Sequence, residues 1–253
     1  MSNKLKLGLF LFFIGFLGVL TLLTVTLPLD TLPPEAIKGL SPVMIKLLVL
    51  ANPAMLLILA VVVGTLLHDK VKLDTPLISR LLGIDSNNPI TFLEQLKYGV
   101  LLGLLGGVTA VAIQAIFAPF IPQEFVEMGK KMQMTTLARF GYGGITEELL
   151  MRFGFMTLIV WLVFLFNKKL GDSTYWTGII LATLLFALGH LPVVFSAVAQ
   201  PSVALLAYVI VGNSIVGVAF GWLYWKKGLE SAFWAHICAH AAMLLSEHLK
   251  DLI

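Results

Sequence analysis

Residues 140–167 read FGYGGITEELLMRFGFMTLIVWLVFLFN, an apolar stretch that carries three charges in its first half. A helix needs about 20 mostly apolar residues to cross a bilayer, and this stretch is long enough. A charged side chain inside hydrocarbon costs roughly 2.5–3.5 kcal/mol, so Glu147, Glu148 and Arg152 need a structural or chemical reason to be there. The stretch therefore predicts a spanning helix that holds a polar site.

The whole chain has the same character. Its 253 residues are 58% hydrophobic and 12% charged, with a mean hydropathy of +0.95. Soluble domains are about 45–50% apolar and about 25% charged. The composition excludes a soluble fold. It predicts an all-α polytopic bundle of about seven, or eight, transmembrane helices, forming a single integral membrane domain over residues 1–253.

Seven apolar ranges can be assigned as spans. They are Leu7–Leu29, Leu47–Leu67, Tyr98–Pro122, Phe140–Asn167, two spans within 172–226 separated near Pro192 and Pro201, and Ser231–Ser246. The polar range 68–97 is expected to be a loop or an interfacial helix, and the amphipathic range 123–139 is expected to lie at the interface. An eighth span would have to be a half-helix near residues 41–46 or in that amphipathic range.

The basic residues lie in short blocks between the spans, which is typical of orientation-setting loops and not of a nucleic-acid surface. Seven alternating spans place more Lys and Arg on the N-terminal side than on the other side. The bias predicts a cytoplasmic N-terminus and a multi-pass protein of a cell membrane, with a prokaryotic source favoured by the compact loops. The expected partner is the lipid bilayer, with no nucleic acid.

The three charges of the first stretch differ in what surrounds them along the helix. Glu148 and Arg152 are spaced i, i+4, so they share a face and are expected to form an ion pair. Glu147 lies about 100° around the helix and is left without a local partner. One reading is a buried structural ion network. The other makes Glu147 a general base in a wet cavity, with Glu148 and Arg152 as its support.

Histidines supply the remaining polar groups of the apolar spans. His190 directly precedes Leu191 and Pro192, so it either caps a helix end or faces the same cavity. His236 and His240 share one helix face, with the spacing of a helical metal-ligand pair. Ile237 follows His236, so the HExxH pattern of zinc proteases is absent. A metal-dependent protease using His236 and His240 stays open as an alternative.

These motifs together resemble a known family. Glu147, Glu148 and Arg152 read as EExxxR, Phe186 and His190 as FxxxH, and His236 stands in the last span. Their order and spacing are similar to those of the CAAX prenyl protease and bacteriocin-processing family of intramembrane glutamic endopeptidases. The resemblance covers about residues 140–246. One position departs from the family pattern HxxxN, because His240 stands in the place of the asparagine.

The resemblance implies a metal-independent hydrolase that needs no cofactor. Glu147 would activate a water molecule with help from His190, and His236 would assist or stabilise the oxyanion. His240 would take the part of the asparagine, because an imidazole N–H can also donate to an oxyanion. The implied substrate is a membrane-associated peptide or protein, with or without a lipid, such as a prenylated CAAX-type C-terminus. A non-enzymatic immunity or scaffold protein, or a transporter, is the third reading.

The depth of these residues in the bilayer sets one further expectation. With a rise of about 1.5 Å per residue, His240 should reach the level of Glu147 more easily than His236.

Overall fold

The computed structural model describes residues 1–26, 38–86 and 88–251, and every regular element in these ranges is a helix. The α-helices are α1 (Asn3–Thr21), α3 (Pro42–Leu67), α4 (Pro76–Leu81), α5 (Phe92–Phe117), α6 (Gln123–Lys131), α7 (Thr136–Ala138), α8 (Thr157–Asn167), α9 (Asp172–Leu188), α10 (Leu191–Ala197), α11 (Val203–Lys227) and α12 (Leu229–Asp251). Short 3₁₀ turns follow α1, α3 and α5. The all-α polytopic prediction is confirmed.

Six helical segments of the described chain are long and apolar enough to cross a membrane. They are Asn3–Thr24, Pro42–Leu67, Phe92–Phe120, Thr136–Asn167, Asp172–Ala197 and Val203–Lys227. The seventh predicted span, Ser231–Ser246, lies within α12, which packs along α5 but carries the polar residues that lower its hydropathy. Residues 42–46 begin α3 and are not a separate half-helix. The predicted end of the first span at Leu29 falls outside the described residues.

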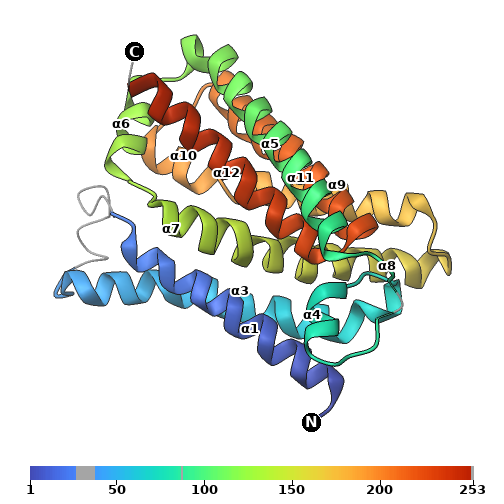
Figure 1. Ribbon diagram of the computed structural model, residues 1–253. Helices are drawn as coiled ribbons and strands as arrows, with labels where there is room; N and C mark the ends of the chain where they lie inside the picture. The colour runs from blue at the N-terminus through green and yellow to red at the C-terminus, as the bar shows by residue number, and fades with distance from the viewer. Residues whose placement is uncertain (27–37, 87, 252–253) are drawn as a thin grey trace.

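The segment Thr136–Asn167, which we call the glutamate helix, lies between two groups of helices (Figure 1). On one side α1 and α3 pack against each other and against the glutamate helix. On the other side α5, α11 and α12 pack together, with α12 also contacting the glutamate helix and α9 contacting both α11 and α8. The three charges of the glutamate helix therefore lie inside protein and away from lipid.

Small residues allow α5 and α12 to approach closely. Inside a bilayer, helix association depends on close packing, because lipid tails are as apolar as the side chains. A Cβ atom at Gly103 of α5 would overlap the backbone carbonyl oxygen of Ala235 in α12. Gly99 and Gly107, one turn away on each side, also lie close to α12. This stripe fixes the distance and register of the helix that carries His236.

A buried polar contact ties the beginning of α12 to its neighbours. The side chain of Glu230 accepts hydrogen bonds from the backbone N–H of Ile78, at 2.8 Å, and from Nε2 of Gln95, at 2.9 Å. Glu230 is 4% exposed, so both bonds lie away from water. They hold α12 against α4 and α5, two turns before His236.

Candidate active site

The backbone around the two glutamates is wider than an α-helix. Arg139–Glu147 and Leu149–Met156 are π-helical, with only Glu148 between them in α-helical form. π-helical turns are rare, occur mostly as single turns, and are frequent at functional sites. The sequence stretch predicted a spanning helix but gave no signal for this geometry.

Glu148 is completely buried and has two partners. Its Oε2 atom lies 3.1 Å from Nε of Arg152, which confirms the predicted i, i+4 ion pair. Its Oε1 atom lies 2.7 Å from Nδ1 of His236 in α12, a contact that the sequence did not predict. The carboxylate therefore joins the glutamate helix to α12 in the middle of the bundle.

Arg152 is buried in an aromatic setting. Its guanidinium carbon lies 5.3 Å from the ring centre of Phe186 and 5.5 Å from that of Phe220, within cation–π range. Its Nη2 atom donates a 3.0 Å hydrogen bond to the carbonyl oxygen of Gly217 in α11. Among the described residues, Nη1 has no hydrogen-bond partner. The charge is thus held by one carboxylate, two aromatic faces and one backbone dipole.

His236 stands between the two glutamates. Since the ionised Glu148 only accepts hydrogen bonds, Nδ1 of His236 carries the donated proton and a neutral ring exposes Nε2 as an acceptor. That Nε2 atom lies 3.8 Å from Oε2 of Glu147, longer than a direct hydrogen bond. The expectation that His240 would reach the glutamates more easily is wrong, because His236 is the α12 histidine that lies beside both of them.

Glu147 is the more accessible of the two carboxylates. Its side chain is 20% exposed, whereas that of Glu148 is 0% exposed. No arginine or lysine is paired with Glu147 in the described part of the chain. The two glutamates therefore differ in their surroundings: Glu148 is buried in an ion pair, whereas Glu147 is partly exposed and lies beside Nε2 of His236.

His240 lies one turn beyond His236. The two imidazoles stack with their centres 4.9 Å apart and an angle of 20° between the ring planes. A Cβ atom at Gly143 would lie 2.7 Å from Nε2 of His240, so this imidazole occupies space that a larger residue at 143 would fill. Nδ1 of His240 is buried without a hydrogen-bond partner among the described residues.

His190 lies directly after the C-terminal end of α9. Its Nδ1 atom donates a 2.8 Å hydrogen bond to the carbonyl oxygen of Phe186, so its Nε2 atom is also an acceptor when the ring is neutral. Phe186 lies edge-on to both His190 and His236, with centres 4.7 and 6.1 Å apart. No hydrogen bond or ion pair joins His190 to Glu147 in the ranges that the structure describes. His190 is therefore connected to His236 through Phe186, whose ring contacts both imidazoles.

Three residues of the site were missed or read differently from the sequence. Phe220, whose ring lies 4.9 Å from that of His236, carried no motif. The spacing of Gly217 and Gly221 is typical of close helix packing, and it gives no sign that the Gly217 carbonyl accepts from Arg152. Gly143 leaves room for His240, a contact that only the fold can reveal.

The histidines and carboxylates were also considered as metal ligands. Among the described residues, no group of three or more His, Cys, Asp or Glu side chains is arranged to hold a metal ion. The rings of His236 and His240 stack face to face, and Nδ1 of His236 is engaged by Glu148. The geometry thus adds no support to the metal alternative.

Comparison with known proteins adds one finding. Residues 132–243 match the family of type II CAAX prenyl endopeptidases described as Rce1-like. No curated protein and no solved structure matches the chain. The matched range contains all six site residues, and the resemblance predicted from their motifs is confirmed.

Proposed function

From this match to CAAX-type membrane proteases, we propose that the chain is a glutamic endopeptidase that cleaves a peptide bond with a water molecule activated by Glu147. The observation that carries the proposal is the pair formed by Glu147 and His236. An accessible carboxylate lies 3.8 Å from an imidazole nitrogen whose ring is fixed from behind by Glu148. Two acceptors at this separation suit one shared water molecule.

The attack follows from the acceptor character of both groups. A water molecule between them donates one hydrogen to Oε2 of Glu147 and the other to Nε2 of His236, which leaves a lone pair free. As the water oxygen bonds to the scissile carbonyl carbon, its proton passes to Glu147. When the C–N bond breaks, that proton passes to the leaving nitrogen, so the carboxylate is restored.

The histidines take two parts in this scheme. While neutral, His236 and His190 present acceptor nitrogens, because their Nδ1 protons are donated to Glu148 and to the carbonyl of Phe186. In that state they orient water. A ring that is already protonated when substrate binds instead carries an Nε2–H donor, which would stabilise the oxyanion. His240, which stands in the place of an asparagine amide, is a secondary hydrogen-bond donor to the oxyanion.

Glu148 and Arg152 support the site without touching substrate. Glu148 fixes the tautomer and orientation of His236, as a carboxylate behind a catalytic imidazole does. Arg152 supplies the counter-charge to Glu148 in an apolar interior. The proposed substrate is a membrane-associated peptide or protein, and the family match favours a lipidated, CAAX-type C-terminus.

Cleavage by purified protein tests the proposal. The substrates are a prenylated CAAX-type peptide and a general peptide library, each with and without a chelator. We expect chelator-resistant cleavage that falls by about 10²–10⁴-fold in Glu147→Gln, the usual contribution of a general base. Glu124→Gln, in the exposed part of α6, is the matched control and should cleave like wild type.

Two results would favour the other readings. Activity that a chelator removes and a divalent metal restores would support a metalloprotease built on His236 and His240. Cleavage that persists in Glu147→Gln would overturn the glutamic mechanism. If no peptide is cleaved and a Glu147→Gln, His190→Ala double variant keeps the wild-type phenotype in cells, a non-enzymatic role is favoured instead.

A further inference from the structure

The proposed cleavage leaves the carbonyl oxygen of the substrate short of hydrogen-bond donors. As the water oxygen bonds to the scissile carbon, that oxygen becomes an oxyanion, and donors aimed at it usually give the largest single contribution to catalysis. While neutral, His236 and His190 present acceptors, because their Nδ1 protons are donated to Glu148 and to the carbonyl of Phe186. His240 has one N–H to give when neutral. A further donor would complete the site.

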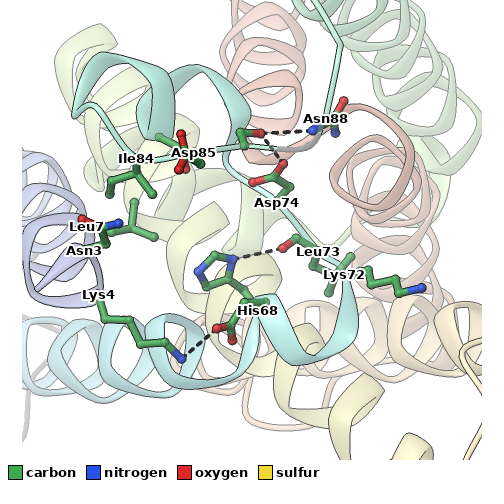
Figure 2. Close-up of a pocket in the computed structure, with 13 residues that line it drawn as sticks. Asn3, Lys4, Leu7, His68, Lys72, Leu73, Asp74, Ile84, Asp85 and Asn88 are labelled. Atoms are coloured by element: carbon green, nitrogen blue, oxygen red, sulfur yellow. Dashed lines mark hydrogen bonds and ion pairs between the residues drawn. The ribbon is translucent and has the colours of Figure 1, made fainter.

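The polar cavity beside the beginning of α1, of about 670 Å³, does not supply this donor (Figure 2). None of the six site residues lines it. The cavity's Lys4 is paired with Asp69, with 2.9 Å between Nζ and Oδ2. The hydroxyl of Ser86 donates to Oδ2 of Asp74 at 2.7 Å. The donor must therefore be sought beside the glutamates.

Two donors of the glutamate helix are already committed. The hydroxyl of Thr146 donates a 2.8 Å hydrogen bond to the carbonyl oxygen of Gly15 in α1, and this threonine is buried. The guanidinium of Arg152 is 1% exposed and is held by Glu148 and by the carbonyl oxygen of Gly217. Neither side chain can turn toward a substrate without breaking buried contacts.

The π-helical turns place residues five apart on the same face of the glutamate helix. In a π-helix the backbone hydrogen bonds join residues i and i+5, so five residues make about one turn. Gly141 and Thr146 show this interval on the face toward α1. A Cβ atom at Gly141 would lie 2.6 Å from Cγ2 of Thr21 in α1. Thr146 bonds to Gly15 of the same helix.

Gly143 and Glu148 show the same interval on the face toward α12. A Cβ atom at Gly143 would lie 2.7 Å from Nε2 of His240. Oε1 of Glu148 lies 2.7 Å from Nδ1 of His236. Two faces of the glutamate helix are thus identified by contacts that repeat every five residues.

Tyr142 and Glu147 are the pair that lies between these two faces. Each stands one residue after a position that faces α1 and one residue before a position that faces α12, so the same interval places both on one face. The phenol of Tyr142 is close enough to the carboxylate of Glu147 for an electrostatic interaction. The tyrosine is partly buried against the core, and its hydroxyl makes no hydrogen bond to a described residue. Tyr142 therefore brings an unengaged hydroxyl to the face that carries the proposed base.

We propose that Tyr142 is a further catalytic residue, whose hydroxyl donates a hydrogen bond to the carbonyl oxygen of the scissile bond as that oxygen becomes an oxyanion. This role rests on the proposed peptidase function. Glu147 takes the proton of the attacking water, so the phenol keeps its own proton and remains a donor throughout the reaction. Tyrosine hydroxyls are among the groups that form oxyanion holes. Tyr142 thus supplies the donor that the neutral His236 and His190 lack.

Steady-state cleavage of the prenylated CAAX-type peptide by Tyr142→Phe tests the proposal, because this variant loses the hydroxyl and keeps the ring. We expect kcat to fall by about 10²-fold, the usual effect of removing one oxyanion donor, with KM near the wild-type value. Tyr208→Phe is the matched control. Tyr208 is a partly buried tyrosine of α11 whose ring faces Phe117, so its variant should cleave like wild type. Both variants should unfold in detergent at the wild-type temperature.

A tetrahedral mimic of the substrate gives a second measurement. A difluoroketone analogue of the same peptide is hydrated at its carbonyl carbon, so it presents a hydroxyl where the oxyanion forms. We expect Tyr142→Phe to weaken inhibition by this analogue by about three- to tenfold, the effect of one hydrogen bond. Inhibition of Tyr208→Phe should match that of wild type.

Three results would overturn this role of Tyr142 and leave the proposed function intact. They are a wild-type kcat in Tyr142→Phe beside an inactive Glu147→Gln, a raised KM at unchanged kcat, and an equal fall of kcat in Tyr208→Phe. The second would mean that the hydroxyl binds substrate and transition state equally. A wild-type protein that cleaves no peptide would instead count against both proposals.

Discussion

Oε1 of Glu148 accepts a 2.7 Å hydrogen bond from Nδ1 of His236, although the two residues are 88 positions apart in the chain. The helices run in opposite directions at this contact. Gly143 lies beside His240, and Arg139 forms a 2.9 Å ion pair with Glu247 further along. The Glu148–His236 hydrogen bond therefore joins two antiparallel helices, the glutamate helix and α12. It connects the charged motif of the first to the histidine motif of the second.

Glu148→Gln should impair both stability and activity. The amide leaves Arg152 without a counterion in a dry interior, and removing one partner of a buried pair costs about 3–5 kcal/mol. It also ceases to fix the tautomer of His236, and losing such a supporting contact typically costs about 10–100-fold in activity. Thermal unfolding in detergent and peptide cleavage measure the two effects.

A paired replacement separates these effects. Glu148→Leu combined with Arg152→Leu removes both charges, and apolar replacement of a buried pair is often neutral or stabilising. We expect the double variant to unfold near the wild-type temperature and still to lack activity. If it cleaved peptide like wild type, Glu148 would have no part in positioning His236.

Gly143→Ala should be tolerated only when His240 is replaced. The added Cβ would lie 2.7 Å from Nε2 of His240 and 3.8 Å from Nε2 of His236. We expect Gly143→Ala alone to lower cleavage, and to have a smaller effect beside the shorter side chain of His240→Asn. Residues in contact usually show coupling of about 0.5–3 kcal/mol in such a cycle. Additive effects would show that the two positions do not constrain each other.

Gly103→Ala should destabilise the bundle, since its Cβ would overlap the carbonyl oxygen of Ala235. Overpacking of this kind costs about 1–3 kcal/mol. Gly129→Ala is the matched control, because nothing lies within 4 Å of a Cβ built there. Unfolding of both variants in detergent provides the measurement, and equal stability would contradict the close packing of α5 against α12.

The stability of the protein should decrease as the pH falls below about 6.5, the ordinary pKa of histidine. Burial lowers the pKa of His68 from this value, and Lys4 acts in the same direction, while the Leu73 carbonyl, Asp69 and Asp74 oppose it. The unfolded chain therefore binds a proton at a higher pH than the folded chain, so stability rises with pH in this window. The lowered pKa of Asp69 matters only in more acidic solution.

His68→Gln isolates this contribution. Glutamine can still donate to the carbonyl of Leu73 but does not titrate. We expect the unfolding temperature of the variant to change less between pH 7.5 and pH 5.5 than that of wild type. An identical pH dependence of the two proteins would show that His68 is not responsible.

The membrane fold and the candidate site residues can be predicted from patterns within short stretches of sequence. Apolar length predicts spans, and the i, i+4 spacing of Glu148 and Arg152 predicts their ion pair. The same spacing leaves Glu147 as the carboxylate without a local partner, which its greater exposure in the structure matches. Family motifs then predict that His190 and His236 belong to the same site.

The contacts between helices could not be derived in this way. The contact of His236 with both glutamates and the π-helical turns of the glutamate helix leave no recognisable spacing signal. The enclosure of Arg152 by Phe186 and Phe220 joins three helices that are distant in sequence. Such contacts are set by how helices pack, and a single sequence does not specify that packing.

The Glu148–Arg152 pair also bears on how the chain enters the membrane during synthesis. Both charges belong to one helix, so they can neutralise each other as soon as that helix forms, before any later helix has been made. His236 belongs to the last helix and reaches Glu148 only after two further spans have been inserted. Membrane insertion is thus separated from completion of the site, and a ribosome that stalls before α12 leaves a stably embedded but incomplete protein.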